Sequence, residues 1–249
     1  TLPSWVNLSL VGTQTFCATV ALVNNRLDQI PVGDTACTEV LVQNPIPVSA
    51  AVPFCADFES SSWGTFEDVP GTEWVLGTPI QGSLTTAYNG TKAYSTNLGA
   101  DYGMRARSYL VSPKFTLDTG TTYILSFAHN MQSEPAVDGG HVEYSFDDIT
   151  WYPLGYTHVP GSTNWCTEPS VVALNGQSGW SRSMTGYQLS SLRLKPGESG
   201  VRFRWTFASS NAVSAPGWTV DQVCLEVDSS TAPVLNLLGQ PPIYATGCP

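Results

Sequence analysis

Residues 108–154 carry the clearest structural pattern of the chain, in three runs: Ser108-Tyr-Leu-Val-Ser-Pro-Lys-Phe-Thr-Leu117, Tyr123-Ile-Leu-Ser-Phe-Ala-His-Asn130 and Asp138-Gly-Gly-His-Val-Glu-Tyr-Ser-Phe-Asp-Asp-Ile-Thr-Trp151. Apolar and polar residues alternate within each run, and Pro, Gly and Asp separate the runs. A period of two residues is typical of antiparallel strands with one buried face. The pattern predicts three strands, which we interpret as one β-meander.

The last of these runs also predicts which side chains are buried. Because successive side chains on a strand point to opposite faces, Val142, Tyr144 and Phe146 share one face, and Glu143 and Ser145 share the other. We expect the apolar face to pack in the core and Glu143 to lie on a solvated face. Asp138-Gly-Gly predicts a turn ahead of the strand.

The end of the same run, Ser145-Phe-Asp-Asp-Ile-Thr-Trp151, resembles the Asp-box hairpin, Ser-x-Asp-x-Gly-x-Thr-Trp, but is one residue shorter and lacks the Gly. In that motif the Asp carboxylate binds turn amides and the Trp covers the hairpin, which implies these roles for Asp147 and Trp151. With no Gly in the turn, Asp148 is the expected left-handed residue, since Asp tolerates that conformation. The motif is a structural device and indicates no activity.

The composition of the 249-residue chain is typical of a secreted β protein. Apolar residues make up 42%, enough for a sizeable core, and charged residues only 12%, about half of the usual ~25%. A net charge of -10, with only 10 Lys and Arg, disfavours nucleic acid and anionic membranes as partners. No run approaches the ~18 apolar residues of a membrane span, so we expect no membrane insertion. Because the chain begins with neither Met nor a signal-like segment, we expect a processed or excised piece.

Six cysteines indicate disulfides rather than a metal site. Their spacing contains no Cys-x-x-Cys pair and no Cys/His cluster, so zinc is not expected. Disulfides form in oxidising compartments, which predicts a secreted protein located outside the cell or on its surface. Spacing alone does not choose among the possible pairings. The cysteines are Cys17, Cys37, Cys55, Cys166, Cys224 and Cys248.

Residues 1–50 differ in character from the rest. Two strand-like runs, Thr15–Val23 and Ala36–Val42, are joined by a loop that ends in Asp28-Gln-Ile-Pro-Val-Gly-Asp-Thr35. They resemble the closing hairpin of the immunoglobulin-like domains of bacterial surface proteins, and in such a hairpin Cys17 and Cys37 would face each other. The Pro-rich connector Asn44–Pro53 follows, and we place a domain boundary at about residue 50.

A series of short blocks then runs through residues 54–227. They are Phe54-Cys-Ala-Asp-Phe-Glu-Ser-Ser-Ser-Trp-Gly64, Glu73-Trp-Val-Leu-Gly-Thr-Pro79, Asn89-Gly-Thr-Lys-Ala-Tyr-Ser-Thr-Asn-Leu98, Tyr109-Leu-Val-Ser-Pro113, Asp138-Gly-Gly, Tyr144-Ser, Gly179-Trp-Ser181, Val201-Arg-Phe-Arg-Trp-Thr-Phe207 and Gly217-Trp-Thr-Val-Asp-Gln-Val223. In this order they resemble the MAM-like jelly-roll domain of large secreted Bacteroidetes surface proteins and of immune-inhibitor-A metalloproteases. The resemblance implies an all-β, two-sheet antiparallel sandwich over residues 51–228.

The jelly-roll resemblance also implies one disulfide. The first and last strands of such a domain lie side by side, and Cys55 and Cys224 fall in those strands. Cys166 and Cys248 are left over. They could bridge the Trp165 loop to the C-terminal tail, or one could be free or intermolecular.

A structural calcium site is a further implication of the resemblance. MAM-like domains often hold Ca²⁺ between the start of the first strand and the end of the last, and calcium takes six to eight oxygen ligands. Asp57, Glu59, Asp68 and Asp221 map there, although Gln222 replaces the second Asp of the last block. The alternative is that Asp57 and Glu59 are solvated neighbours of Phe58 and that Asp221 caps a turn.

Residues for catalysis are sparse, and we expect no enzyme. The histidines are His129, His141 and His158, without a His-Glu-x-x-His motif, and Gly176-Gln-Ser-Gly179 is not a nucleophile elbow. Glu134, Asp138 and Glu143 are candidates for a glycosidase pair. We interpret them instead as a turn and a solvated strand face.

The tryptophans and two short motifs suggest binding and modification sites. Trp165 and Trp180 lie in the Gly-, Ser- and Asn-rich segment 155–188, so we predict that they are exposed and form a ligand surface. Asn89-Gly-Thr is an N-glycosylation sequon, and Thr35, in Asp34-Thr35-Ala36, resembles a Bacteroidetes O-glycosylation site. Five of the other six tryptophans are expected in the core. They are Trp63, Trp74, Trp151, Trp205 and Trp218.

Three functions are compatible with these residues and motifs. The first is adhesion by a non-enzymatic bacterial surface module that binds surface glycans or proteins. The second is a structural subunit of an extracellular filament or array, in which copies of the chain bind one another by strand exchange. The third is the accessory domain of a secreted metalloprotease. Residues 229–249 form either a linker or, as the second function requires, a strand donated to a neighbour.

Overall fold

The computed structural model describes residues 12–19, 22–23, 26–27, 35–69 and 72–238. The chain divides into two compact units, Thr1–Pro45 and Ile46–Pro249. The division falls a few residues before the boundary expected at about residue 50. The reason is that β5 (Ile46–Pro47), in the Pro-rich connector, pairs with β11 (Phe115–Thr116) of the second unit.

The first unit contains the predicted hairpin. Strands β1 (Gly12–Thr19) and β4 (Thr35–Val42) pair antiparallel, and β2 (Leu22–Val23) pairs with β3 (Arg26–Leu27). Cys17 lies directly opposite Cys37, and the two form a disulfide.

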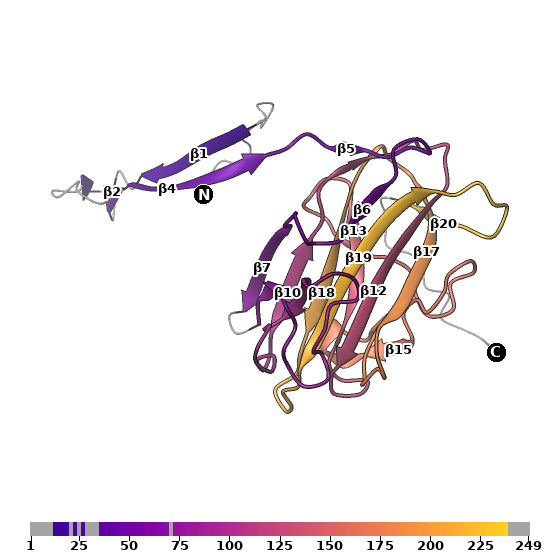
Figure 1. The fold of residues 1–249 in the computed structure, drawn as a ribbon. Coiled ribbons are helices and arrows are strands. Elements are labelled where there is room, and N and C mark those ends of the chain that lie inside the picture. The colour runs from indigo at the N-terminus through magenta and orange to yellow at the C-terminus, as the bar shows by residue number, and fades with distance from the viewer. Residues whose placement is uncertain (1–11, 20–21, 24–25, 28–34, 70–71, 239–249) are drawn as a thin grey trace. The chain divides into compact units, whose positions relative to one another are not determined.

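Two large, mainly antiparallel sheets make up most of the second unit, so the predicted all-β sandwich is confirmed (Figure 1). We name the sheets after their central strands. The β18 sheet has the order β14 (Tyr152–Pro153), β13 (Gly139–Ser145), β18 (Gly200–Ala208), β10 (Arg107–Val111) and β7 (Gly64–Val69), with β11 on β18. The β19 sheet has the order β20 (Leu235–Leu237), β17 (Gln188–Pro196), β12 (Tyr123–Gln132), β19 (Gly217–Val227), β9 (Ala93–Thr96) and β8 (Trp74–Gly77), with β6 (Phe54–Ala56) on β19.

The predicted β-meander is wrong. The three runs do form strands β10, β12 and β13, but β10 and β13 both pair with β18, whereas β12 pairs with β17 and β19 in the other sheet. The connections therefore cross from one sheet to the other instead of making tight hairpins. This crossing lets each strand bury its apolar face against the opposite sheet.

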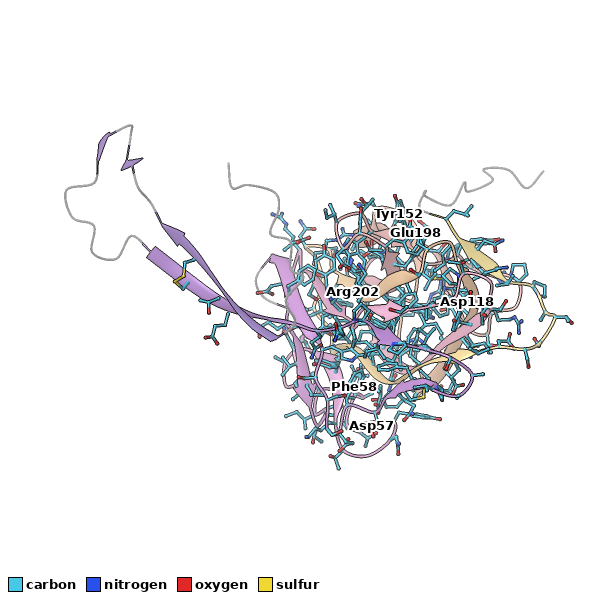
Figure 2. All side chains as sticks on the ribbon, turned by 90° about the horizontal axis from the view of Figure 1, so that it is seen from above. Asp57, Phe58, Asp118, Tyr152, Glu198 and Arg202 are labelled. Carbon is cyan, nitrogen blue, oxygen red and sulfur yellow. A yellow bond between two sulfur atoms is a disulfide. The ribbon has the colours of Figure 1, made fainter. Side chains whose placement is uncertain are left out.

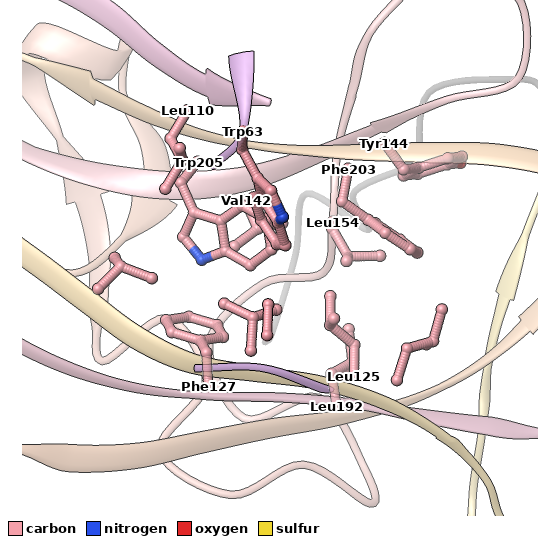
Figure 3. Close-up of a cluster of buried hydrophobic side chains, with 14 of the residues drawn as sticks. Trp63, Leu110, Leu125, Phe127, Val142, Tyr144, Leu154, Leu192, Phe203 and Trp205 are labelled. Atoms are coloured by element: carbon pink, nitrogen blue, oxygen red, sulfur yellow. The ribbon is translucent and has the colours of Figure 1, made fainter. Parts of the chain in front are cut away.

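Aromatic and aliphatic side chains fill the space between the two sheets (Figure 3). Phe127 of β12 and Trp205 of β18 meet with ring centroids 5.5 Å apart, and Trp63 lies 5.4 Å from Trp205. Val142 and Tyr144 point into this core as predicted, and Phe146 packs against its edge. Burial of this apolar surface is the main force that holds the sheets together.

The first and last strands of the sandwich are neighbours. β6 pairs antiparallel with β19. Cys55 of β6 lies opposite Cys224 of β19, and the two cysteines form a disulfide. In this structure the start of the C-terminal segment returns to its own domain, because β20 pairs in parallel with β17 and the Tyr144 hydroxyl donates to the Leu238 carbonyl.

The Asp-box prediction is confirmed for Asp147 and Asp148. The Asp147 carboxylate accepts hydrogen bonds from the amides of Ile149 and Thr150, at 2.9 and 2.7 Å. These bonds hold the pKa of the Asp147 carboxyl well below its usual range. Asp148 takes the left-handed conformation, with φ of 63°.

The only helix in the described part of the chain is the three-residue η1 (Val172–Leu174), between β15 (Glu168–Val171) and β16 (Gln177–Gly179). Within the described residues, no helix is long and apolar enough to cross a membrane.

Candidate ligand-binding face

The outer face of the β18 sheet, the side turned away from the core, gathers charged and aromatic side chains. On β18 the alternation of side chains buries Val201, Phe203, Trp205 and Phe207 in the core. The residues between them point to the outer face, where they meet the outward residues of β13. These outward residues are Arg202, Arg204 and Thr206 of β18 and His141, Glu143 and Ser145 of β13.

A stacked row of side chains crosses this face, and we call it the Arg204 row. The Arg204 guanidinium carbon lies 4.3 Å from the ring centroid of Trp151 on one side and 4.3 Å from that of Tyr109 on the other. Tyr109 in turn stacks on Phe66, with centroids 4.5 Å apart and planes 28° from parallel. The row thus connects β7, β10 and β18 with the Asp-box hairpin.

Glu143 fixes the arginine in the middle of the row. The Arg204 Nε donates to Glu143 Oε2 at 2.7 Å, and the Thr206 hydroxyl donates to the same oxygen. Burial alone would raise the pKa of Glu143, but His141 and Arg204 lower it below its usual range. Glu143 lies on the predicted face but is only 6% exposed, so the expectation of a solvated side chain is wrong. The ion pair with Arg204 is what allows it to be buried.

Other side chains lie beyond the Arg204 row in both directions along the strands. Towards one end, His141 is buried, and burial lowers its pKa to about 4, so it is neutral at pH 7. Beyond it, Val171 and Leu174 of the β15–η1–β16 segment pack on Ala208. Towards the other end, the Asp148 carboxylate forms ion pairs with Arg202 (labelled in Figure 2), at 3.0 Å, and with Lys114, at 3.2 Å.

The members of the row differ in what they expose. Tyr109 is only 4% exposed and its hydroxyl donates to Asp68, and burial and this bond raise the pKa of Tyr109 to about 12. Phe66, at one end, is 47% exposed, and Trp151, at the other, is partly exposed. The Arg204 side chain is 13% exposed. The face therefore offers ring surface at its two ends and guanidinium donors between them.

The sequence did not single out this row. The sequence predicts Trp151 in the core, and no motif marks Phe66, Tyr109 or Arg204 as site residues. One signal was present, since the alternation in Val201-Arg-Phe-Arg-Trp-Thr-Phe207 already places Arg202 and Arg204 on the face opposite the aromatic residues.

Trp165 and Trp180, predicted to form an exposed ligand surface, are buried, with 3% and 0% exposure. Their rings pack against each other at 5.2 Å and both contact Phe127 of the core. Their indole N–H groups donate to the carbonyls of Leu154 and Asn164. The prediction is wrong because the polar segment 155–188 folds back onto the sandwich and supplies these partners.

The four acids predicted to hold calcium are not gathered. No cluster of three or more His, Cys, Asp or Glu side chains occurs among the described residues. Asp68 lies on β7 and accepts the Tyr109 hydroxyl, and Asp57 (Figure 2) accepts the Glu59 amide. The remaining two acids lie near each other, since burial raises the pKa of Asp221 and the charge of Glu59 raises it further.

Glu59 and Asp221 instead bind one loop, residues 88–92. Glu59 accepts the amides of Thr91 and Lys92, and Asp221 accepts those of Tyr88 and Asn89. The Lys92 ammonium also lies 3.0 Å from the Glu59 carbonyl oxygen. Since N–H donors and an ammonium already occupy these oxygens, the arrangement does not fit a cation.

The carboxyl groups considered for catalysis have structural roles. Asp138 is buried and accepts the Tyr102 hydroxyl and the Ser210 amide, while Glu143 binds Arg204. Glu134 accepts the Ser210 hydroxyl at 3.3 Å.

The remaining predicted positions are placed as follows. Asn89 is exposed, and the side chain of Thr35 lies outside the described part of the chain. Cys166 is a free, buried thiol whose pKa is raised by burial. Cys248 lies outside the described residues, so its pairing stays open.

The fold and this face define an antiparallel two-sheet β-sandwich that presents a fixed arginine between aromatic rings. No protein-family model and no curated protein matches the sequence. Similar solved structures include the K2 cleaved adhesin domain of Lys-gingipain, at 15% identity and a TM-score of 0.41, over 72% of this chain and 99% of that chain.

Two carbohydrate-binding modules are also similar. One is the C-terminal family 22 module of a Clostridium thermocellum protein, at 10% identity and a TM-score of 0.40, over 71% of this chain and 94% of that chain. The other is TmCBM61, solved in complex with beta-1,4-galactotriose, at 11% identity and a TM-score of 0.37, over 69% and 91%. Likeness at this level transfers no function to the present chain.

Proposed function

We propose that this chain is a non-catalytic, extracellular binding module that recognises glycans on the outer face of the β18 sheet. The observation that carries the proposal is the Arg204 row. Stacking on Tyr109 and Trp151 and the bond to Glu143 hold the guanidinium in one orientation before any ligand arrives. Binding to such a site costs little ordering of side chains.

The chemistry of the row suits a sugar chain. Sugar hydroxyls and ring oxygens accept hydrogen bonds, which the free guanidinium edge donates. Apolar sugar faces pack on aromatic rings, which Phe66 and Trp151 supply at the two ends of the row. With strands about 4.8 Å apart, a row across four neighbouring positions spans roughly 15 Å, which is enough for a short oligosaccharide.

Two features support an extracellular site of action. The Cys17–Cys37 and Cys55–Cys224 disulfides require an oxidising compartment to form and persist. We propose that this glycan binding serves adhesion of the parent protein to surface glycans. The filament and metalloprotease alternatives stay predictions.

Titration of the purified chain with a panel of polysaccharides, by affinity electrophoresis and calorimetry, tests the proposal. F66A and W151A should each weaken binding by about tenfold or more, as loss of an aromatic contact does at other binding sites. Tyr88 is the matched control, because it is 45% exposed, close to the 47% of Phe66, and its amide binds Asp221 of the β19 sheet. Y88A should bind like the wild type.

Two results would overturn the proposal. The first is the absence of binding to any glycan by the folded wild-type chain. The second is an equal loss in Y88A and F66A, which would place the ligand elsewhere. Circular dichroism of each variant checks that its sheets are intact.

A further inference from the structure

The outer face of the β18 sheet differs in charge from the rest of the chain. It carries four of the ten basic residues, Arg107, Lys114, Arg202 and Arg204, and four acids. Its formal charge is therefore 0, whereas the whole chain carries -10. The net negative charge of the chain thus lies outside this face, and an anion is repelled least here. The four acids are Asp68, Glu143, Asp147 and Asp148.

All four acids are already bound within the protein, Asp147 by the amides of its own turn. Glu143 accepts Arg204 and Thr206, Asp148 accepts Arg202 and Lys114, and Asp68 accepts the Tyr109 hydroxyl. Glu143 and Asp148 are therefore already paired with basic side chains of the same face.

The basic side chains, in contrast, keep unused donors. Arg204 donates only through Nε, and its Nη groups make no hydrogen bond within the described residues. A guanidinium carries five N–H donors. The Arg107 side chain, half-buried on β10, makes neither a hydrogen bond nor an ion pair among the described residues.

The charges of these two arginines affect the pKa values of other residues on the face. The charges of Arg107 and Arg204 both lower the pKa of His141, and both oppose the rise in the pKa of Tyr109. Because His141 is neutral at pH 7, the two arginines are the source of positive potential at the centre of the face.

Resting on the proposed function, we infer that the glycan bound here is anionic and that its carboxylate or sulfate groups bind Arg204 and Arg107. A planar guanidinium pairs with either group through two parallel N–H···O bonds, the strongest hydrogen bonds that a side chain offers. The stacked rings keep Arg204 in the orientation that such a pair needs.

Matched pairs of polysaccharides, each with and without its charge, test the inference. One pair is polygalacturonate and its methyl ester, which probes carboxylate; the other is carrageenan and its desulfated form, which probes sulfate. We expect the charged member of at least one pair to bind at least tenfold more tightly. This preference should fall as salt rises from about 0.05 to about 0.5 M, since screening weakens contacts between exposed charges.

The variant R107Q should lose most of the preference for the charged member. Lys195 is the control for loss of one positive charge, because it lies on β17 of the other sheet; K195Q should keep the preference. If the neutral and charged members bind equally and F66A still weakens both, the anionic ligand is excluded while the proposed function stands.

Other outcomes are also decisive. Equal effects of R107Q and K195Q would mean attraction to the chain as a whole and would overturn the assignment to this face. Absence of binding by all four polysaccharides in the wild type, together with a negative glycan panel, would overturn the proposed function itself.

Discussion

Gly140 shows at the scale of one residue how closely the two sheets approach. A Cβ added here would overlap the Cζ3 and Cε3 atoms of Trp218 and would lie 2.9 Å from the Thr206 carbonyl oxygen. Trp218 is fully buried and cannot move aside without disturbing the core.

The variant G140A should therefore lower the free energy of unfolding by about 1–3 kcal/mol, the usual cost of overpacking a core. Denaturant unfolding followed by tryptophan fluorescence measures it. Gly64 of β7 is the matched control, because no atom lies within 4 Å of its added Cβ. An equal loss in G64A and G140A would show that strand flexibility, not contact with Trp218, sets the cost.

Gly139 and Gly140 also show what a local sequence pattern does not reveal. Asp138-Gly-Gly was predicted to be a turn, but Gly139 and Gly140 are the first residues of β13 and are buried. Glycine is needed there because Trp180 and Trp218 approach the backbone closely. Both tryptophans are distant in sequence, so no local pattern could reveal the contact.

At the scale of strands, β12 and β13 each bury a neutral histidine. The Trp218 indole N–H donates to Nδ1 of His129 on β12, 3.1 Å away. The imidazole proton of His129 therefore lies on Nε2, which is 2.8 Å from the Ser190 hydroxyl oxygen. Burial lowers the pKa of His129 to about 3 and that of His141 to about 4, from 6.5 in the unfolded chain.

Between pH 6.5 and 4 the unfolded chain therefore takes up protons that the folded chain does not. Stability should fall as the pH is lowered through this window, by up to about 1.4 kcal/mol per pH unit for each histidine. Glu143 acts at lower pH, because its lowered pKa means that its contribution is lost only below the unfolded value of 4.5. Urea unfolding at a series of pH values gives the slope.

In H141Q the slope between pH 6.5 and 4 should be about half that of the wild type, whatever the absolute stability of the variant. His158 is exposed, so H158Q serves as the control and should retain the full slope. A wild-type slope in H141Q would contradict the assignment of the pH dependence to the buried rings.

Periodicity in the sequence predicts strands and their faces but not their sheets. The alternation in Val142-Glu-Tyr-Ser145 places the correct side chains in the core, yet it cannot show that β12 lies in the opposite sheet from β13. The predicted exposure of Glu143 on the outer face is wrong for a related reason. Glu143 is buried because Arg204, some 60 positions away in sequence, reaches it through strand pairing.

At the scale of the whole molecule, the two disulfides serve different units. Cys17–Cys37 joins residues 20 apart within the first unit, and Cys55–Cys224 joins residues 169 apart, the first and last strands of the sandwich. On the loop-entropy model a bridge over the longer interval stabilises by about 5 kcal/mol, and one over the shorter by about 3 kcal/mol.

C55A/C224A should accordingly lower the free energy of unfolding of the sandwich by up to about 5 kcal/mol, because the unfolded chain regains the freedom that the bridge removes. Seven of the eight tryptophans belong to the unit Ile46–Pro249, among them Trp63, Trp205 and Trp218 of the core, so the fluorescence reports mainly on this unit. C17A/C37A is the matched control, since it removes a bridge from the other unit and should leave the fluorescence transition unchanged. A similar shift in both double variants would show that the two units unfold as one, and would contradict the independence that their division at Pro45 indicates.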